Sequence, residues 1–293
     1  MASTEAAPPA HGDRSTVALA VTLAALVIVL ALRFTLNPVA DALLVQAASA
    51  TVLLLVPLLA MKVGTQPIPP RPDRGLTIAA FVAGILAAIA GAWLLAVADG
   101  LLTLWVGPLD SGGATAGSDP AILLVQGLLL PAGQSVLFWL YLLPRLPAVS
   151  RPSAPWLGGW LFAGAAILIS NLGVSAGVAA LPLGMAAALL TDLGRTAWAG
   201  ALVTVAHALA GLLLPPYLLA LLGLNALSLN WVGAALLSLF GLFLVLQVVR
   251  AVSPPRTAAG QPSRPRRQRP LLWGYSALVM AVTALELFLR SRS

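Results

Sequence analysis

Long hydrophobic stretches separated by short polar or proline-rich segments dominate this chain of 293 residues. An apolar run of about 20 residues is long enough to cross the hydrocarbon core of a bilayer as a helix. Because lipid offers no hydrogen-bond partners, a spanning segment must satisfy its own backbone groups, as a helix does. The pattern therefore predicts an all-α, polytopic transmembrane helical bundle. It indicates about nine spans, at residues 16–36, 42–61, 76–98, 121–143, 156–178, 177–190, 196–214, 231–249 and 271–289.

The polar segments divide the chain into four parts. Residues 1–15 are polar and contain prolines and a glycine, so we expect a disordered tail. Residues 16–249 form the predicted transmembrane bundle. Residues 250–270 are rich in proline and arginine, which predicts a cytoplasmic linker, and residues 271–293 hold the final transmembrane helix with a short tail.

Prolines and a change of composition mark the less regular segments. Residues 99–120 contain three aspartates and a Gly/Ser-rich centre but no Lys or Arg, which predicts an outer-face loop with residues 101–106 in the membrane interface. We expect Pro182 to break the short sixth segment and the prolines at 215–216 to end the seventh span. Residues 217–224 are then expected to lie flat or to re-enter the membrane.

The fourth span combines a proline with a stripe of polar residues. Pro131 has no N–H to donate and lies within the apolar run, so we expect it to kink the helix. Gln126, Leu130, Gln134 and Phe138 recur at four-residue spacing and therefore share one helix face. A face that carries two amides should lie against protein rather than lipid.

Composition excludes several classes of protein. Hydrophobic residues make up 60% of the chain and charged residues 9%, which is more apolar than the core of a soluble domain requires. The absence of cysteine excludes disulfides and thiolate metal sites. The chain contains two histidines, His11 and His207, so we expect no catalytic metal site and no cofactor. The net charge of +7 is interpreted as a topology signal, and no nucleic-acid partner is expected.

Lys and Arg residues are distributed unevenly over the predicted loops. With nine crossings, thirteen of the sixteen lie on one side, and an excess of these residues marks the cytoplasmic side. If the short sixth segment only re-entered the membrane, the distribution would become eight against eight. We therefore expect a prokaryotic plasma membrane protein with a cytoplasmic N-terminus and an external C-terminus. The thirteen are Arg14, Lys62, Arg71, Arg74, Arg145, Arg151, Arg195, Arg250, Arg256, Arg264, Arg266, Arg267 and Arg269.

The predicted linker is also a candidate lipid-binding segment. Six arginines lie between Arg250 and Arg269. Each arginine close to an anionic membrane surface gains on the order of 1 kcal/mol. We therefore expect this segment to bind anionic lipid, in addition to the contact that the bilayer makes with the spans.

The end of the fourth span resembles the first motif of the CPBP family, the membrane proteases related to the CAAX prenyl endopeptidase. That motif reads Glu-Glu-x-x-x-Arg, usually Glu-Glu-x-x-Phe-Arg-Gly-x-Leu, on a transmembrane helix. Phe138 and Leu142 match it, and the Pro-Arg-Leu ending at 144–146 strengthens the likeness. The resemblance covers about residues 76–214 and implies a CPBP-like helical core.

The positions that carry chemistry in this motif are substituted. Gln134 and Ser135 stand where the two glutamates belong, and Trp139 stands where the arginine belongs. The resemblance implies that the first glutamate is the general base that activates a water, a role for which Gln134 has no proton-accepting group. A carboxylate within hydrocarbon costs roughly 2.5 to 3.5 kcal/mol and persists mainly where function requires it. Alternatively, Gln134 and Ser135 are ordinary polar contacts between packed helices.

Two further CPBP motifs are resembled in part. The second, Phe-x-x-x-His, has Val174 and Val178 in place of the phenylalanine and the histidine. The third, His-x-x-x-Asn or Asp, is matched by His207, with Gly211 in place of the last residue. The resemblance implies that one catalytic-type side chain remains. Alternatively, His207 bonds to a neighbouring helix or to the hydroxyl of Thr204, one turn earlier.

The resemblance also implies a common central site. We expect the fourth, fifth and seventh spans to pack together, with Gln134, Ser135, Val178 and His207 lining that site. At about 1.5 Å per residue, Ser135 lies roughly 12 Å and His207 roughly 17 Å from the cytoplasmic ends of their helices. The two side chains could therefore meet.

Three functions remain open. The favoured one is a proteolytically inactive CPBP-like protein that acts as a membrane scaffold or as a binding partner of another membrane protein. The second is an intramembrane protease or hydrolase that uses Ser135 as nucleophile and His207 as base. The third is a transporter component, although ion-coupled transport is disfavoured by the scarcity of charge within the spans.

Overall fold

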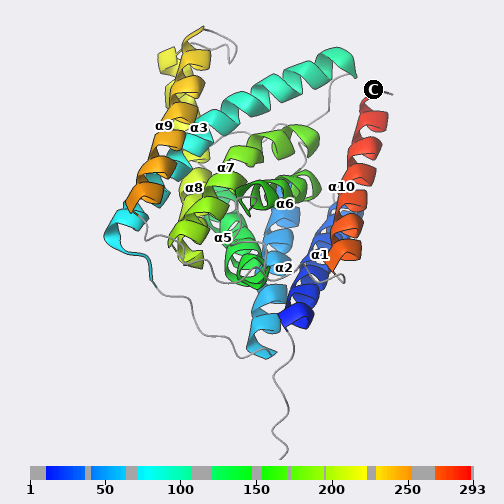
Figure 1. Cartoon of the computed structure of the whole chain (residues 1–293). Coiled ribbons are helices and arrows are strands. Elements are labelled where there is room, and N and C mark those ends of the chain that lie inside the picture. The colour runs from blue at the N-terminus through cyan, green and yellow to red at the C-terminus, as the bar shows by residue number, and fades with distance from the viewer. Residues whose placement is uncertain are drawn as a thin grey trace, which may run out of the picture.

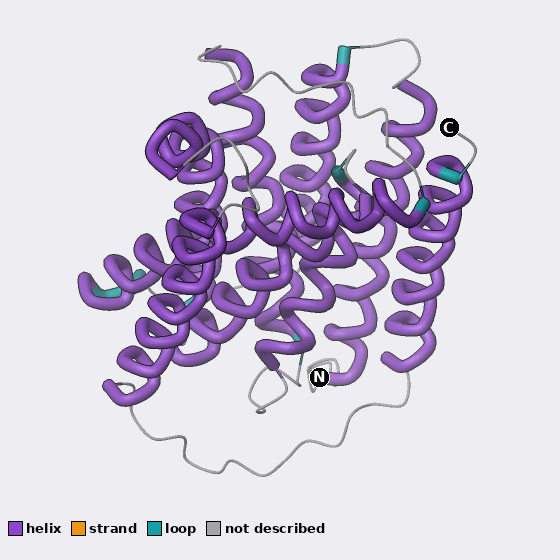
Figure 2. Tube along the Cα trace, turned by 90° about the horizontal axis from the view of Figure 1, so that it is seen from above, coloured by secondary structure: helices purple, strands orange, loops and turns teal. Residues whose placement is uncertain are grey.

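The computed structural model describes residues 11–36, 41–63, 71–106, 120–146, 154–170, 173–194, 196–222, 229–252 and 268–291. Within these ranges the chain forms nine helices and no strand, which confirms the all-α bundle (Figures 1 and 2). Eight of these helices are long and apolar enough to cross a membrane. The nine are α1 (His11–Leu36), α2 (Ala42–Val63), α3 (Arg74–Trp105), a composite helix from Pro120 to Arg145 that includes α5 (Leu130–Ser135), α6 (Ala154–Ile169), α7 (Gly173–Gly194), α8 (Ala197–Leu222), α9 (Leu229–Val252) and α10 (Gln268–Arg290).

α1 and α3 extend into segments that were predicted to be a tail and a loop. α1 begins at His11, so residues 11–15 are helical rather than part of a disordered tail, and residues 1–10 lie outside the described ranges. α3 continues to Trp105, so Asp99 belongs to a helix and not to a loop. The continuation is possible because no proline interrupts α3 and its last residues are mostly apolar. The rest of the predicted loop, residues 107–119, is outside the described ranges.

The fifth and sixth predicted segments meet at a different point from the one expected. α6 ends at Ile169 and α7 begins at Gly173, whereas Pro182 lies inside α7 and does not break it. Gly173 has a φ of 51°, a left-handed conformation that glycine adopts without steric cost. With 16 residues, α6 is about 24 Å long, shorter than the hydrocarbon core of about 30 Å.

The prediction that prolines end the seventh span is wrong. α8 runs through residues 215–216 and ends at Leu222, so residues 217–222 continue the helix instead of lying flat. Proline fixes φ near the helical value, and membrane helices tolerate it where nearby groups satisfy the freed carbonyl. Residues 223–228 are outside the described ranges.

Small residues bring the backbones of α3, α7 and α8 close together. A Cβ added at Gly84 would lie 2.6 Å from the carbonyl oxygen of Val203 on α8. One added at Gly91 would lie 2.9 Å from the carbonyl oxygen of Ala179 on α7. Because leucine gains nothing over lipid at such contacts, membrane helices associate through small residues that allow close packing. The buried face of α3 consists of Ala80, Ala83, Gly84, Ala87, Ala88, Ala90 and Gly91.

Two charged side chains from distant helices contact the end of α6 and the start of α7. Arg33 on α1 places Nη1 3.4 Å from the carbonyl oxygens of Ile167 and Leu168, at the end of α6. The Glu286 carboxylate on α10 accepts a 2.9 Å hydrogen bond from the backbone N–H of Val174, at the start of α7. A cation at a helix C-terminus and an anion at an N-terminus both complement the helix dipole.

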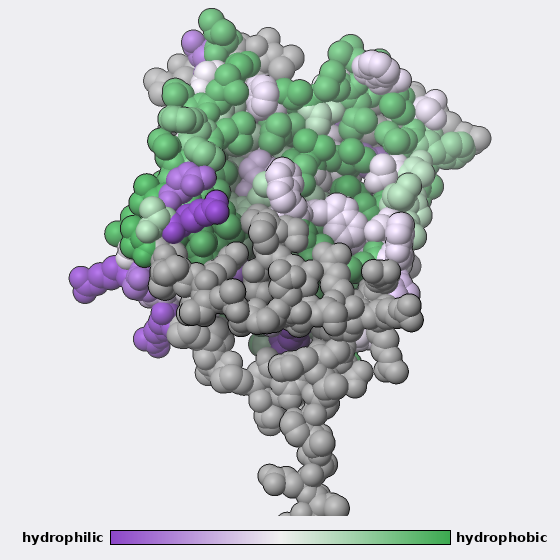
Figure 3. All heavy atoms as spheres, viewed as in Figure 1, coloured by the Kyte–Doolittle hydropathy of each residue, from purple (hydrophilic) through white to green (hydrophobic). Residues whose placement is uncertain are grey.

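The outer helices and the molecular surface fit a membrane protein. α9 packs on α3, and α10 packs on α1 and α6, on opposite sides of the bundle (Figure 1). α1 begins at the bottom of Figure 1 and α10 ends at the top. Apart from the atoms drawn in grey, the face shown in Figure 3 is largely hydrophobic, with hydrophilic residues gathered at the lower left. Which end of the bundle faces the cytoplasm stays a prediction from the sequence.

Two glycines of α3 give a matched test of this packing. We expect Gly84→Ala to destabilise the folded bundle by about 1 to 3 kcal/mol, because the new methyl group overpacks the contact with α8. Gly100→Ala lies on the same helix where no atom falls within 4 Å of the added Cβ, so it should be neutral or stabilising by up to about 1 kcal/mol. Reversible unfolding in mixed micelles measures both, and equal stabilities for the two variants would contradict the packing.

Candidate binding pocket

The helix that carries the resembled motif is continuous but irregular. Two π-helical segments, η1 (Leu123–Leu129) and η2 (Val136–Leu142), lie on either side of α5. The backbone N–H of Leu130 donates to the carbonyl oxygen of Val125, five residues earlier. This wider turn accommodates Pro131 within a continuous helix. Single π turns of this kind frequently occur at functional sites.

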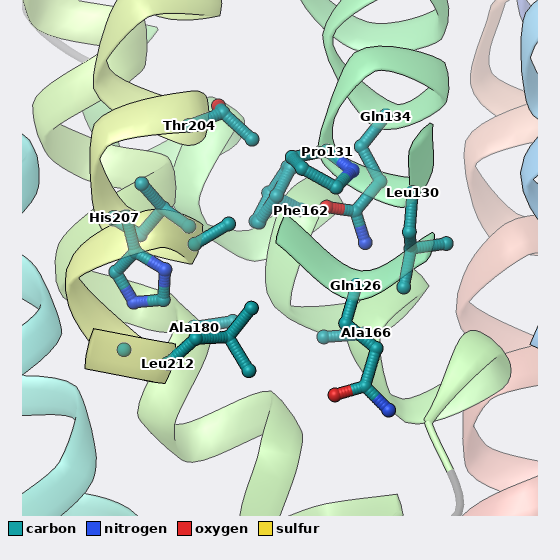
Figure 4. Close-up of a pocket in the computed structure, with 13 residues that line it drawn as sticks. Gln126, Leu130, Pro131, Gln134, Phe162, Ala166, Ala180, Thr204, His207 and Leu212 are labelled. Atoms are coloured by element: carbon teal, nitrogen blue, oxygen red, sulfur yellow. The ribbon is translucent and has the colours of Figure 1, made fainter. Parts of the chain in front are cut away.

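A pocket of about 290 Å³ lies among this helix, α6, α7 and α8 (Figure 4). Gln126, Gln134, Thr204 and His207 supply its polar groups. The two glutamines therefore face protein, which confirms the prediction for the polar stripe of the fourth span. The remaining lining residues are Leu130, Pro131, Phe162, Ala166, Ala180, Leu183, Ala208, Gly211 and Leu212.

Some of the positions singled out by the sequence line this pocket, and others do not. Gln134, His207 and Gly211 line it. Ser135 is buried, at 3% exposure, but is not among the lining residues, and its Oγ has no hydrogen-bond partner in the described part of the chain. Val178 lies on α7 rather than on the fifth span and does not line the pocket either. The structure thus brings two of the four expected residues, Gln134 and His207, to one pocket, together with the motif position Gly211.

Trp139, which stands in place of the motif's arginine, belongs to η2 and packs against α6 and α8. Its Nε1 donates to the hydroxyl of Thr204 at 2.7 Å, and that hydroxyl donates to the carbonyl oxygen of Gly200 at 3.0 Å. A Cβ at Gly200 would lie 2.9 Å from the indole, so the glycine makes room for the ring. The indole stacks on Phe162, with ring centroids 5.5 Å apart and planes inclined by 19°. Trp139 is therefore a structural link beside the pocket.

Gln134 and His207 lie on opposite sides of the pocket (Figure 4). Neither side chain has a hydrogen-bond partner among the described residues. The hydroxyl of Thr204 bonds to Trp139 and Gly200 and is not the partner of His207. The pocket therefore contains two polar side chains that remain available to a bound molecule.

The lining of the pocket is neutral. None of the lining residues is Asp, Glu, Lys or Arg. In the described ranges, no group of three or more His, Cys, Asp or Glu could hold a metal ion. His207 is thus the one lining side chain able to act as a general base, and the lining supplies no carboxylate to orient it.

Sequence reasoning missed two contacts beside the pocket. Gln126 Nε2 donates to Gln46 Oε1 on α2 at 2.9 Å. Gln46 is the only amide side chain in the second predicted span, which could have marked it as a partner for the polar stripe. The bond between Trp139 and Thr204 had no comparable signal, because it joins residues 65 positions apart on helices whose relative rotation the sequence does not specify.

No family model matches this sequence, and no match occurs among curated proteins or solved structures. The likeness to the CPBP family therefore rests on the motif residues and their spacing.

A double-mutant cycle tests the link between Trp139 and Thr204. We expect Thr204→Val to destabilise the protein by about 1 to 3 kcal/mol, because it leaves the buried indole N–H without a partner. Trp139→Phe should also destabilise it. Because the double variant loses the bond only once, a coupling energy of about 0.6 to 1.7 kcal/mol is expected from unfolding in mixed micelles. Effects that add within about 0.3 kcal/mol would show that the bond is absent.

Proposed function

We propose that this protein is a CPBP-like membrane protein that binds rather than cleaves, and that it acts as a scaffold or binding partner for another membrane protein. The observation that carries the proposal is the environment of Trp139. In the resembled motif this position holds an arginine, whose charge could stabilise a developing anion. Here an indole, hydrogen-bonded to Thr204 and stacked on Phe162, occupies the position and serves packing.

Gln134 supports the same proposal. Water activation requires a proton acceptor within hydrogen-bond reach of the water. Gln134 lines the pocket at the position where the resemblance expects the base, but its amide cannot take a proton near neutral pH. The pocket can therefore hold a polar group at this point without deprotonating it.

A hydrolase that uses Ser135 and His207 is the competing function. His207 faces the pocket and is able to act as a base. Ser135 is buried beside the pocket without lining it, so its hydroxyl would have to move before it could attack a bound substrate. This geometry favours binding over catalysis.

The outer faces of α9 and α10 are exposed and are available to a protein partner. In the most apolar 18-residue stretch of α9, only 17% of the residues are buried within the chain. In that of α10, 6% are buried. α10 is attached on one side through Tyr275, whose hydroxyl donates to the carbonyl oxygen of Leu161, and through Glu286. Its outer face includes Trp273, which is 74% exposed.

Photo-crosslinking from α10 tests the scaffold role. We expect a benzophenone amino acid in place of Trp273, in native membranes, to yield one discrete adduct with an integral membrane protein, identified by mass spectrometry. The same amino acid in place of Tyr275, which is 4% exposed, is the matched control and should give no intermolecular adduct. Adducts with lipid alone at Trp273 would contradict a partner on this face.

Activity-based labelling tests the absence of hydrolysis. We expect the purified protein to cleave no peptide and to resist labelling by a fluorophosphonate probe. Ser135→Ala should change stability by less than about 0.5 kcal/mol, because the hydroxyl it removes has no hydrogen-bond partner to lose. Labelling that disappears in both Ser135→Ala and His207→Ala would establish a serine hydrolase and refute the proposal.

A further inference from the structure

We propose that the central pocket binds a neutral, single-chain lipid whose head carries a hydroxyl or an amide group. This inference goes beyond the scaffold role and does not require a protein partner.

The polar side chains of the pocket favour a ligand that can both donate and accept hydrogen bonds. Gln134 has an amide that donates and accepts, and a neutral imidazole such as that of His207 does the same through its two nitrogens. Neither side chain has a partner among the described residues. A polar group left unpaired in apolar surroundings is unfavourable, so a hydroxyl or amide head placed between the two would be stabilised.

Because no charged side chain lines the pocket, we expect the ligand to be uncharged. No side chain that lines the pocket is acidic, lysine or arginine. A carboxylate, phosphate or ammonium head would therefore enter a site that offers no counter-charge, which is costly away from water. A neutral head avoids this cost.

The size of the pocket suits the polar end of a small ligand. The pocket measures about 290 Å³ and lies at the small end of the range for ligand sites. It has room for a head group and the first carbons of one chain, which would contact Leu130, Phe162 and Leu212.

Gly211 offers a way to block the pocket without disturbing the bundle. It lines the pocket one turn after His207, and no atom lies within 4 Å of the position that a Cβ would take. Gly211→Leu should therefore add a branched side chain at the wall of the pocket without a clash at its Cβ. Gly274 on α10 is exposed and equally free of neighbours, so Gly274→Leu is the matched control.

Photoreactive lipid probes test the proposal on the full-length protein in nanodiscs. The principal probe is a C16 alcohol with a diazirine in the chain and a terminal alkyne. Three counterparts have the same chain with a carboxylate, a trimethylammonium or a methyl group in place of the hydroxyl. We expect the alcohol to label peptides of α5 or α8 at least fivefold more than any counterpart, with unlabelled monoacylglycerol as a competitor.

The variants should then separate ligand binding from folding. Gly211→Leu should abolish the excess labelling by the alcohol, whereas Gly274→Leu should retain it. Gln134→Leu combined with His207→Leu should weaken binding of the alcohol roughly tenfold, because two hydrogen bonds are lost. Thermal unfolding of each variant confirms that the bundle is intact.

Three results would overturn the inference. These are equal labelling by the alcohol and the methyl probe, stronger labelling by a charged probe, and labelling that Gly211→Leu does not reduce. A pocket that holds only water would give the first of these. Release of an alcohol from an ester analogue would refute the proposed absence of hydrolysis but not lipid binding, so the two proposals fail separately.

Discussion

The close approach of the α3 backbone to α7 and α8 is the contact on which the rest of the structure depends. Lipid chains are as apolar as leucine, so burial alone does not hold membrane helices together, and close packing through small residues must do so. A Cβ at Gly84 would collide with Val203, and one at Gly91 would collide with Ala179. The same contact positions His207, whose Nε2 would lie 3.5 Å from a Cβ at Gly91. The location of the candidate ligand-binding histidine is therefore a consequence of helix packing.

The polar side chains that line the pocket, taken with their direct partners, fall into two groups with different consequences. The first group forms hydrogen bonds between helices, and these bonds stabilise the bundle. It consists of Trp139 with Thr204 and Gln126 with Gln46. Gln134 and His207 do not find partners among the described residues and lie on one pocket. Because an unpaired polar group is unfavourable in apolar surroundings, the second group is where function is expected.

The sequence predicted the existence of the spans but not their ends. Apolar length identifies a span directly, whereas the effect of Pro182 or of the prolines at 215–216 depends on neighbouring helices that satisfy the freed carbonyls. The shared location of Gln134 and His207 followed from resemblance to the CPBP motifs, and the structure brings them to one pocket. The placement of Ser135 away from that pocket could not be predicted, because it depends on the rotation of a helix that contains two π segments.

A cryo-EM structure of the protein in lipid nanodiscs, at a resolution that shows side chains, tests the central claim most directly. The claim is that a neutral pocket beside a fixed Trp139 holds a ligand between Gln134 and His207. The predicted result is an indole within hydrogen-bond distance of Thr204 and elongated density that begins between Gln134 and His207. A Trp139 side chain that faces lipid, or Gln134 and His207 on separate surfaces of the bundle, would contradict it.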